Sequence, residues 1–108
     1  EHRTVVVDDG STDGTADVAR AEVPGCVVLR HEVNRGPGAA MDTGLRRVLE
    51  EAAPGDLVVT LEADGTSDLQ ILPALVRLCR EGGCDVSLAS VYARGGRIEN
   101  TSRLRMFL

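Results

Sequence analysis

The chain has 108 residues, enough for one domain with a core or for part of one. Hydrophobic residues make up 43% and charged residues 27%, as in ordinary globular proteins, and the net charge of −5 argues against nucleic acid as a partner. Every cation is an arginine, and the two aromatic residues, Tyr92 and Phe107, are too few for a stacking platform. Three cysteines without metal-ligand spacing predict free thiols in a reducing compartment.

The first predicted element is a strand over residues 4–7, where three valines follow one another. Consecutive β-branched residues are typical of a strand that is buried on both faces, as in parallel sheets. Asp8 and Asp9 follow at its carboxyl end, which is where open α/β sheets bind ligands. The strand is therefore expected to present two carboxylates to a polar ligand.

A helix is expected next, capped by Ser11 or Asp13 and running to about residue 21. A second strand over residues 26–31 and a polar loop over residues 32–38 lead into a longer amphipathic helix. Gly44 inside that helix costs about 1 kcal/mol relative to alanine, so we expect it to pack closely against a neighbour. The predicted apolar stripe of the helix comprises Met41, Leu45, Val48, Leu49 and Ala52.

The second half of the chain repeats this alternation. A strand is predicted over residues 57–61, with an acidic tip at residues 62–65, and a further strand over residues 86–89. Between them lies a helix with Pro73 in its first turn and a stop at Gly82, and another helix is expected from Thr101 or Ser102. The apolar face of the middle helix comprises Leu72, Leu75, Val76 and Cys79.

Alternating strands and helices predict an α/β fold with an open, mainly parallel sheet and flanking helices. Because the carboxyl ends of parallel strands meet at one edge, three polar clusters are expected to converge there. They are Asp8-Asp9, Asn34-Arg35-Gly36 and Glu62-Ala63-Asp64. Carboxylates suit a hard divalent cation, and an arginine with backbone amides suits a diphosphate. The pattern indicates a metal-bound nucleotide or another phosphorylated ligand.

These motifs resemble those of the family 2, GT-A type glycosyltransferases. The resemblance rests on Val-Val-Asp-Asp-Gly-Ser-Thr-Asp-Gly-Thr at 6–15, Asn-Arg-Gly-Pro-Gly-Ala-Ala at 34–40, Gly44, Glu-Ala-Asp-Gly at 62–65, Leu72-Pro73, and Gly95-Gly96 leading to Arg105. The late glycines and Arg105 are similar to those of polyprenyl-phosphate sugar transferases of the dolichol-phosphate mannosyltransferase kind. The resemblance implies a partial Rossmann-like GT-A domain over residues 1–108 that lacks the family's first strand and C-terminal part.

The resemblance also implies roles for single residues. Asp8 and Asp9 match positions that contact the base and ribose of the nucleotide-diphosphate sugar donor. Arg35 lies in the loop that closes over the base, and Gly36 and Gly38 are expected to form its turn. Asp64 matches the second acid of the family's D-x-D motif, the usual ligand of Mn²⁺ or Mg²⁺.

Glu62 replaces the first acid of D-x-D, and we expect it to contact the donor rather than to ligate the metal directly. Thr66 lies where some relatives supply another metal ligand. Arg105 matches an arginine that faces phosphates, while Val91 stands where an arginine is usual. The implied reaction inverts the sugar, and no general base is identified. The acceptor is expected to be polyprenyl phosphate, with a glycan or small-molecule hydroxyl as the alternative.

Other predictions concern the surroundings of the site. Asp13, Asp17 and Asp68 are interpreted as turn or helix-start residues, and His2 and His31 as having no ligand partners. We expect a cytoplasmic protein that associates with the inner face of the membrane through regions outside this sequence. A phospho-receiver signalling domain is a more distant alternative, disfavoured because the chain has no lysine.

Overall fold

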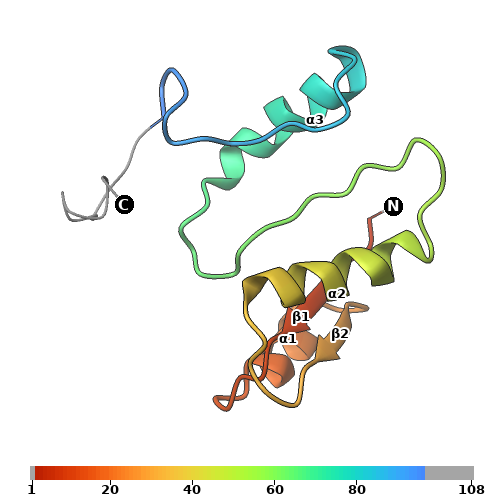
Figure 1. The fold of residues 1–108 in the computed structure, drawn as a ribbon, viewed down its shortest axis with the longest axis vertical. Coiled ribbons are helices and arrows are strands. Elements are labelled where there is room, and N and C mark those ends of the chain that lie inside the picture. The colour runs from red at the N-terminus through yellow and green to blue at the C-terminus, as the bar shows by residue number, and fades with distance from the viewer. Residues whose placement is uncertain (1, 97–108) are drawn as a thin grey trace. The chain divides into compact units, whose positions relative to one another are not determined.

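The computed structural model describes residues 2–96 and divides the chain into two units, Glu1–Val58 and Val59–Leu108. The first unit contains β1 (Val5–Asp8), α1 (Thr15–Glu22), β2 (Val27–Arg30) and α2 (Pro37–Leu49) (Figure 1). The second contains a short 3₁₀ turn, η1 (Leu69–Ile71), and α3 (Leu72–Glu81).

The two strands of the first unit are parallel, as predicted. Their register pairs Val5 with Val27 and runs to Asp8 opposite Arg30. The ladder continues past β2, because the backbone N–H of His31 donates to the Asp8 carbonyl over 2.9 Å. Since both strands run in the same direction, their carboxyl ends lie at one edge of the sheet. The segment that follows β1 and the segment that follows β2 meet at this edge.

The start of α1 differs from the expectation. Its N-cap is Gly14 rather than Ser11 or Asp13, although the Asp13 carboxylate accepts a hydrogen bond from the Thr15 N–H over 3.1 Å. Asp13 therefore forms a local turn just before the helix. Asp17 lies in the first turn, where a carboxylate interacts favourably with the helix dipole. The interpretation of both aspartates as helix-start residues is therefore confirmed.

The helix α2 lies alongside β1 (Figure 1). Gly44 meets Val7 there: a Cβ at Gly44 would lie 3.1 Å from the Val7 Cγ2 atom, which confirms the predicted close packing. The predicted apolar stripe was wrong in part, because Met41, Leu45 and Leu49 are all at least 36% exposed. The half-buried face is formed instead by smaller residues and the stem of an arginine: Ala39, Ala40, Thr43, Gly44, Arg47 and Val48.

The helix α3 follows the prediction closely. Its half-buried face is the predicted set, Leu72, Leu75, Val76 and Cys79. Pro73 lies in the first turn and Gly82 ends the helix. The Asp68 side chain accepts a hydrogen bond from the Gln70 N–H over 3.0 Å, which confirms its capping role at η1.

The strands predicted over residues 57–61 and 86–89 do not form. A strand requires a partner whose backbone continues its hydrogen-bond ladder, and within residues 2–96 neither segment has one. Their apolar side chains stay exposed, with Val59 at 49% and Leu88 at 82%. The apolar residues of these two segments thus favour strands, but the segments do not form strands in the described part of the chain.

The remaining predictions fall outside this description or concern single features. The helix expected from Thr101 or Ser102 lies outside the described residues. Cys26, Cys79 and Cys84 are free thiols, as predicted. Across residues 2–96, no helix combines the length and apolar character that crossing a bilayer requires.

Candidate functional site

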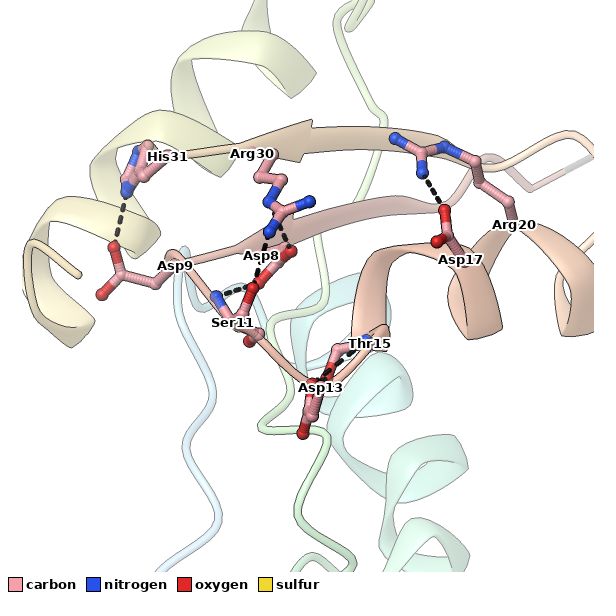
Figure 2. Close-up of polar contacts among 9 residues, drawn as sticks. All are labelled: Asp8, Asp9, Ser11, Asp13, Thr15, Asp17, Arg20, Arg30 and His31. Carbon is pink, nitrogen blue, oxygen red and sulfur yellow. Dashed lines mark hydrogen bonds and ion pairs between the residues drawn. The ribbon is translucent and has the colours of Figure 1, made fainter. Parts of the chain in front are cut away.

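Asp8 ends β1 with its side chain turned inward, and the residue is 3% exposed. Its Oδ1 accepts the Ser11 N–H over 2.8 Å, and the Arg30 Nε lies 3.3 Å from its Oδ2 (Figure 2). Arg30 also donates to the Ser11 carbonyl over 2.7 Å. Hydrogen bonds from Ser11 lower the pKa of the Asp8 carboxyl, and the charge of Arg30 lowers it further. Asp8 therefore shapes the turn that follows β1.

Asp9 points to the other side of that turn, toward the segment after β2. Its Oδ1 accepts the Arg35 N–H over 2.9 Å, and its Oδ2 accepts the Gly36 N–H over 2.7 Å. His31 Nδ1 lies 2.6 Å from the same Oδ1 (Figure 2). The contact with His31 lowers the pKa of the Asp9 carboxyl, and the two loop amides add to the effect. One carboxylate thus joins the ends of both strands.

Close approach of the backbone makes this junction possible. Gly10 has a φ of +79°, and a Cβ there would lie 2.6 Å from the backbone nitrogen of Asn34. A side chain at this position would push the two loops apart. We refer to Asp9, His31 and the loop Asn34–Gly36 together as the Asp9 junction.

The loop of the Asp9 junction leads directly into α2. Gly36 has a φ of +89° and is the N-cap of the helix, and Pro37 occupies the first turn. The expectation that Gly38 also forms the loop's turn was wrong, because Gly38 already lies inside α2. The helix begins at Pro37, two residues earlier than the sequence indicated, because a rigid proline and the first intrahelical hydrogen bonds already fix the chain direction there.

His31 is the residue that the sequence analysis missed. It is 9% exposed, and both ring nitrogens have partners: Asp9 at Nδ1 and the Thr43 hydroxyl at Nε2, over 2.9 Å. The parallel register of the two strands could have indicated the contact of His31 with Asp9. Once Asp8 lies opposite Arg30, the next residues along the two strands, Asp9 and His31, become neighbours.

The acidic tip lies in the second unit. The Asp64 Oδ1 accepts both the Thr66 N–H over 2.9 Å and the Thr66 hydroxyl over 2.7 Å, which lowers the pKa of the Asp64 carboxyl. Gly65, with a φ of +74°, allows the tight turn between them. Glu62 lines a surface hollow together with Leu61, Ala63, Gly65, Ser67 and Leu69. The convergence of this tip with the Asp9 junction stays a prediction.

The residues late in the chain are described in part. Arg94 and Gly95 lie in a turn, with Val91 46% exposed. Arg97, Arg103 and Arg105 fall outside the described residues, so the predicted phosphate contact of Arg105 stays a prediction.

Comparison with known proteins identifies the family. The sequence model of Glycosyl transferase family 2 matches residues 1–107. The chain belongs to glycosyltransferase family 2. The match confirms the resemblance drawn from the motifs and, together with the parallel β1–β2 pair, the GT-A α/β fold class. It also sets aside the phospho-receiver alternative.

Several relatives of this family 2 chain carry names that describe lipid-phosphate acceptors. An undecaprenyl-phosphate mannosyltransferase of Micrococcus luteus is 37% identical over 108 residues, which covers 95% of this chain and 43% of the relative. A dolichol-phosphate mannosyltransferase of Pyrococcus furiosus is 30% identical over 102 residues, or 92% and 27% of the two chains. An undecaprenyl-phosphate 4-deoxy-4-formamido-L-arabinose transferase of Serratia proteamaculans is 39% identical over 85 residues, or 75% and 24%.

The chain therefore spans between 24% and 43% of the length of these three relatives. No solved structure is significantly similar to it. The family 2 assignment rests on sequence, and the roles of single residues within the site stay predictions.

Proposed function

We infer that this chain is the donor-binding part of a glycosyltransferase that transfers a sugar from a nucleotide diphosphate to polyprenyl phosphate, with inversion. The observation that carries this proposal is the Asp9 junction. It lies at the carboxyl edge of two parallel strands, where α/β folds bind nucleotides, in a chain that belongs to family 2.

In this proposal the Asp9 junction receives the nucleoside. The Asp9 carboxylate accepts hydrogen bonds from the base or ribose, Arg35 closes over the base, and Gly36 lets the backbone approach the ligand. Arg35 is exposed, so its side chain is free to move onto a bound base. Asp8 supports the turn beneath the nucleoside and holds Asp9 at its position.

The acidic tip has the chemistry to hold a divalent cation on the donor diphosphate. Asp64, Thr66 and Glu62 are exposed and offer hard oxygen atoms, which Mg²⁺ and Mn²⁺ prefer. Within residues 2–96 no group of three acidic, histidine or cysteine residues surrounds one point. Mg²⁺ is commonly bound by one or two carboxylates plus substrate phosphates, so the Asp64 carboxylate would hold the ion together with the donor diphosphate. When bound, the ion would stabilise charge on the leaving diphosphate.

The names of the relatives support a lipid-phosphate acceptor. In the proposed reaction, the bond between the sugar C1 and the donor phosphate breaks while a phosphate oxygen of the lipid bonds to C1. An acceptor phosphate is already ionised near neutral pH, so it requires no strong base. The arginines late in the chain would align the two phosphates; they are Arg94, Arg97, Arg103 and Arg105. A lipid acceptor would bring the reaction to the cytoplasmic face of a membrane.

A transfer assay tests the proposal. The purified protein is incubated with labelled sugar nucleotides, Mg²⁺ or Mn²⁺, and either polyprenyl phosphate or soluble sugars. We expect label in the organic phase with polyprenyl phosphate, and its loss in Arg105→Ala. Label found on soluble glycans alone would favour the alternative acceptor, a glycan hydroxyl, and overturn the lipid-phosphate proposal.

A further inference from the structure

His31 connects three elements of the first unit through one side chain. It follows β2, its Nδ1 lies 2.6 Å from the Asp9 Oδ1 at the end of β1, and its Nε2 lies 2.9 Å from the Thr43 hydroxyl on α2. The ring is 9% exposed. A buried ring with both nitrogens engaged has a fixed orientation.

The direction of each hydrogen bond follows from the partners. An ionised carboxylate can accept but not donate, so the Nδ1 must carry a proton and donate to Asp9. The Thr43 hydroxyl can donate to a neutral Nε2 or accept from a protonated one. The bond to Asp9 therefore persists in either protonation state of the ring.

This bond determines which oxygen of Asp9 is left for a ligand. The Oδ1 accepts two hydrogen bonds, from His31 and from the Arg35 N–H. The Oδ2 accepts one from the described residues, from the Gly36 N–H. Each carboxylate oxygen has two lone pairs, so Oδ2 retains acceptor capacity and Oδ1 does not.

We propose that His31 is a positioning residue that holds the Asp9 carboxylate so that its Oδ2 faces an N–H or O–H donor of the nucleoside. The inference rests on the proposed function, because it assumes that a nucleoside diphosphate binds at the Asp9 junction. Without the Nδ1 donor, the carboxylate can rotate about its terminal torsion and release Oδ1. Both the carboxylate and the loop would then be less ordered before binding.

Two substitutions of His31 separate positioning from packing. The amide nitrogen of asparagine lies close to the place of Nδ1, so His31→Asn retains a donor to Asp9. The amide of glutamine extends toward the place of Nε2, so His31→Gln retains a contact with Thr43 and loses the one with Asp9. His2→Asn, at an exposed position, is the matched control.

Calorimetric titration with UDP and GDP in the presence of Mg²⁺ provides the binding test. We expect His31→Gln to weaken binding about tenfold, as for loss of one well-placed hydrogen bond to a charged group. His2→Asn should bind as the wild type does, and His31→Asn, which keeps the Asp9 contact and loses the one with Thr43, should bind at most about threefold more weakly. In the transfer assay, His31→Gln should raise KM and leave kcat unchanged, because a ground-state contact is lost.

Wild-type affinity in a folded His31→Gln variant would overturn the inference, as would equal losses in both His31 variants accompanied by equal falls in Tm. If His31→Gln does not fold, Thr43→Val decides, since loss of the second anchor should weaken binding about threefold and unchanged binding would contradict positioning.

A measurement on the free protein distinguishes failure of the inference from failure of the proposed function. Amide hydrogen exchange at Arg35 and Gly36 should be slow in the wild type and His31→Asn, and faster in His31→Gln. A wild-type protein that binds neither nucleotide would count against the proposed function alone. Unchanged exchange at both amides in His31→Gln would overturn the positioning role whatever the ligand.

Discussion

Asp8 and Asp9 are adjacent in the sequence and have different surroundings. Asp8 is buried beside Ser11 and Arg30, whereas Asp9 joins His31 to the backbone of Arg35 and Gly36. The sequence predicted that both carboxylates face a ligand, but it could not say how the turn after β1 would orient each of them. The structure assigns one carboxylate to the turn and the other to the loop.

The pKa of Asp9 makes the Asp9 junction sensitive to acid. Its pKa in the folded protein is below the ordinary value of 3.8, chiefly because of His31 and then the loop amides. A lowered pKa means that the contribution to stability is present above the unfolded-state pKa and is lost as the pH falls through the folded-state pKa. We expect NMR titration of the Gly36 and Arg35 amide signals to give a midpoint below 3.8. A midpoint at or above that value would contradict the geometry, and Asp9→Asn should abolish the transition.

Gly10 permits the approach of the two loops, and substitution there should be costly. Gly10→Ala adds a Cβ 2.6 Å from the Asn34 nitrogen at a φ of +79°, and we expect a loss of about 1–3 kcal/mol in the free energy of unfolding. Gly14→Ala is the matched control, since its φ is +81° and nothing lies within 4 Å of its Cβ. Chemical denaturation of both variants measures the difference. Equal losses would show that the approach to Asn34 adds nothing beyond backbone strain.

At the scale of elements, the spacing of apolar residues predicted which segments form helices better than it predicted which face of a helix is buried. The helix α2 formed where the apolar stripe indicated, yet its half-buried face is shifted toward Thr43, Gly44 and Arg47. The sequence could locate Gly44 as a packing contact because glycine is unfavourable in a helix interior. It could not reveal that the larger residues Met41 and Leu45 would stay exposed.

Packing of α2 on β1 can be tested at Gly44. Gly44→Ala should change the free energy of unfolding little, because about 1 kcal/mol of helix propensity offsets a contact of 3.1 Å with Val7. Gly44→Leu should destabilise the first unit by about 1–3 kcal/mol through overpacking. Thermal unfolding followed by circular dichroism measures both. A Gly44→Leu variant as stable as the wild type would show that α2 does not pack closely on β1.

At the scale of the whole molecule, the two strands expected over residues 57–61 and 86–89 did not form, because the sequence of a segment does not show whether another strand pairs with it. Their apolar composition is typical of buried parallel strands, but burial depends on partners that pair with the backbone. The sequence did predict the family, because the order and spacing of several short motifs are more specific than any one element. His31 was missed because the contact depends on register, which appears when the two strands are aligned.

The proposed metal ion requires the acidic tip to act on a donor that is held by the Asp9 junction. We expect Asp64→Asn to lower transfer about 100-fold, as for other losses of charge stabilisation at a leaving group. Glu62→Asp should be tolerated, because it restores the commoner family residue. Transfer rates measured across a Mn²⁺ titration test both variants, and a chelator should abolish wild-type activity. Full activity in Asp64→Asn would remove this residue from the site.

The central claim is that a nucleoside diphosphate binds at the Asp9 junction, and NMR mapping on the labelled protein tests it most directly. Addition of UDP or GDP with Mg²⁺ should shift the amide signals of Asp9, Gly10, His31, Arg35 and Gly36 more than those of α3. The same titration of Asp9→Ala should give no saturable shifts in this set. Saturable shifts confined to α3, or unchanged binding by Asp9→Ala, would contradict the account.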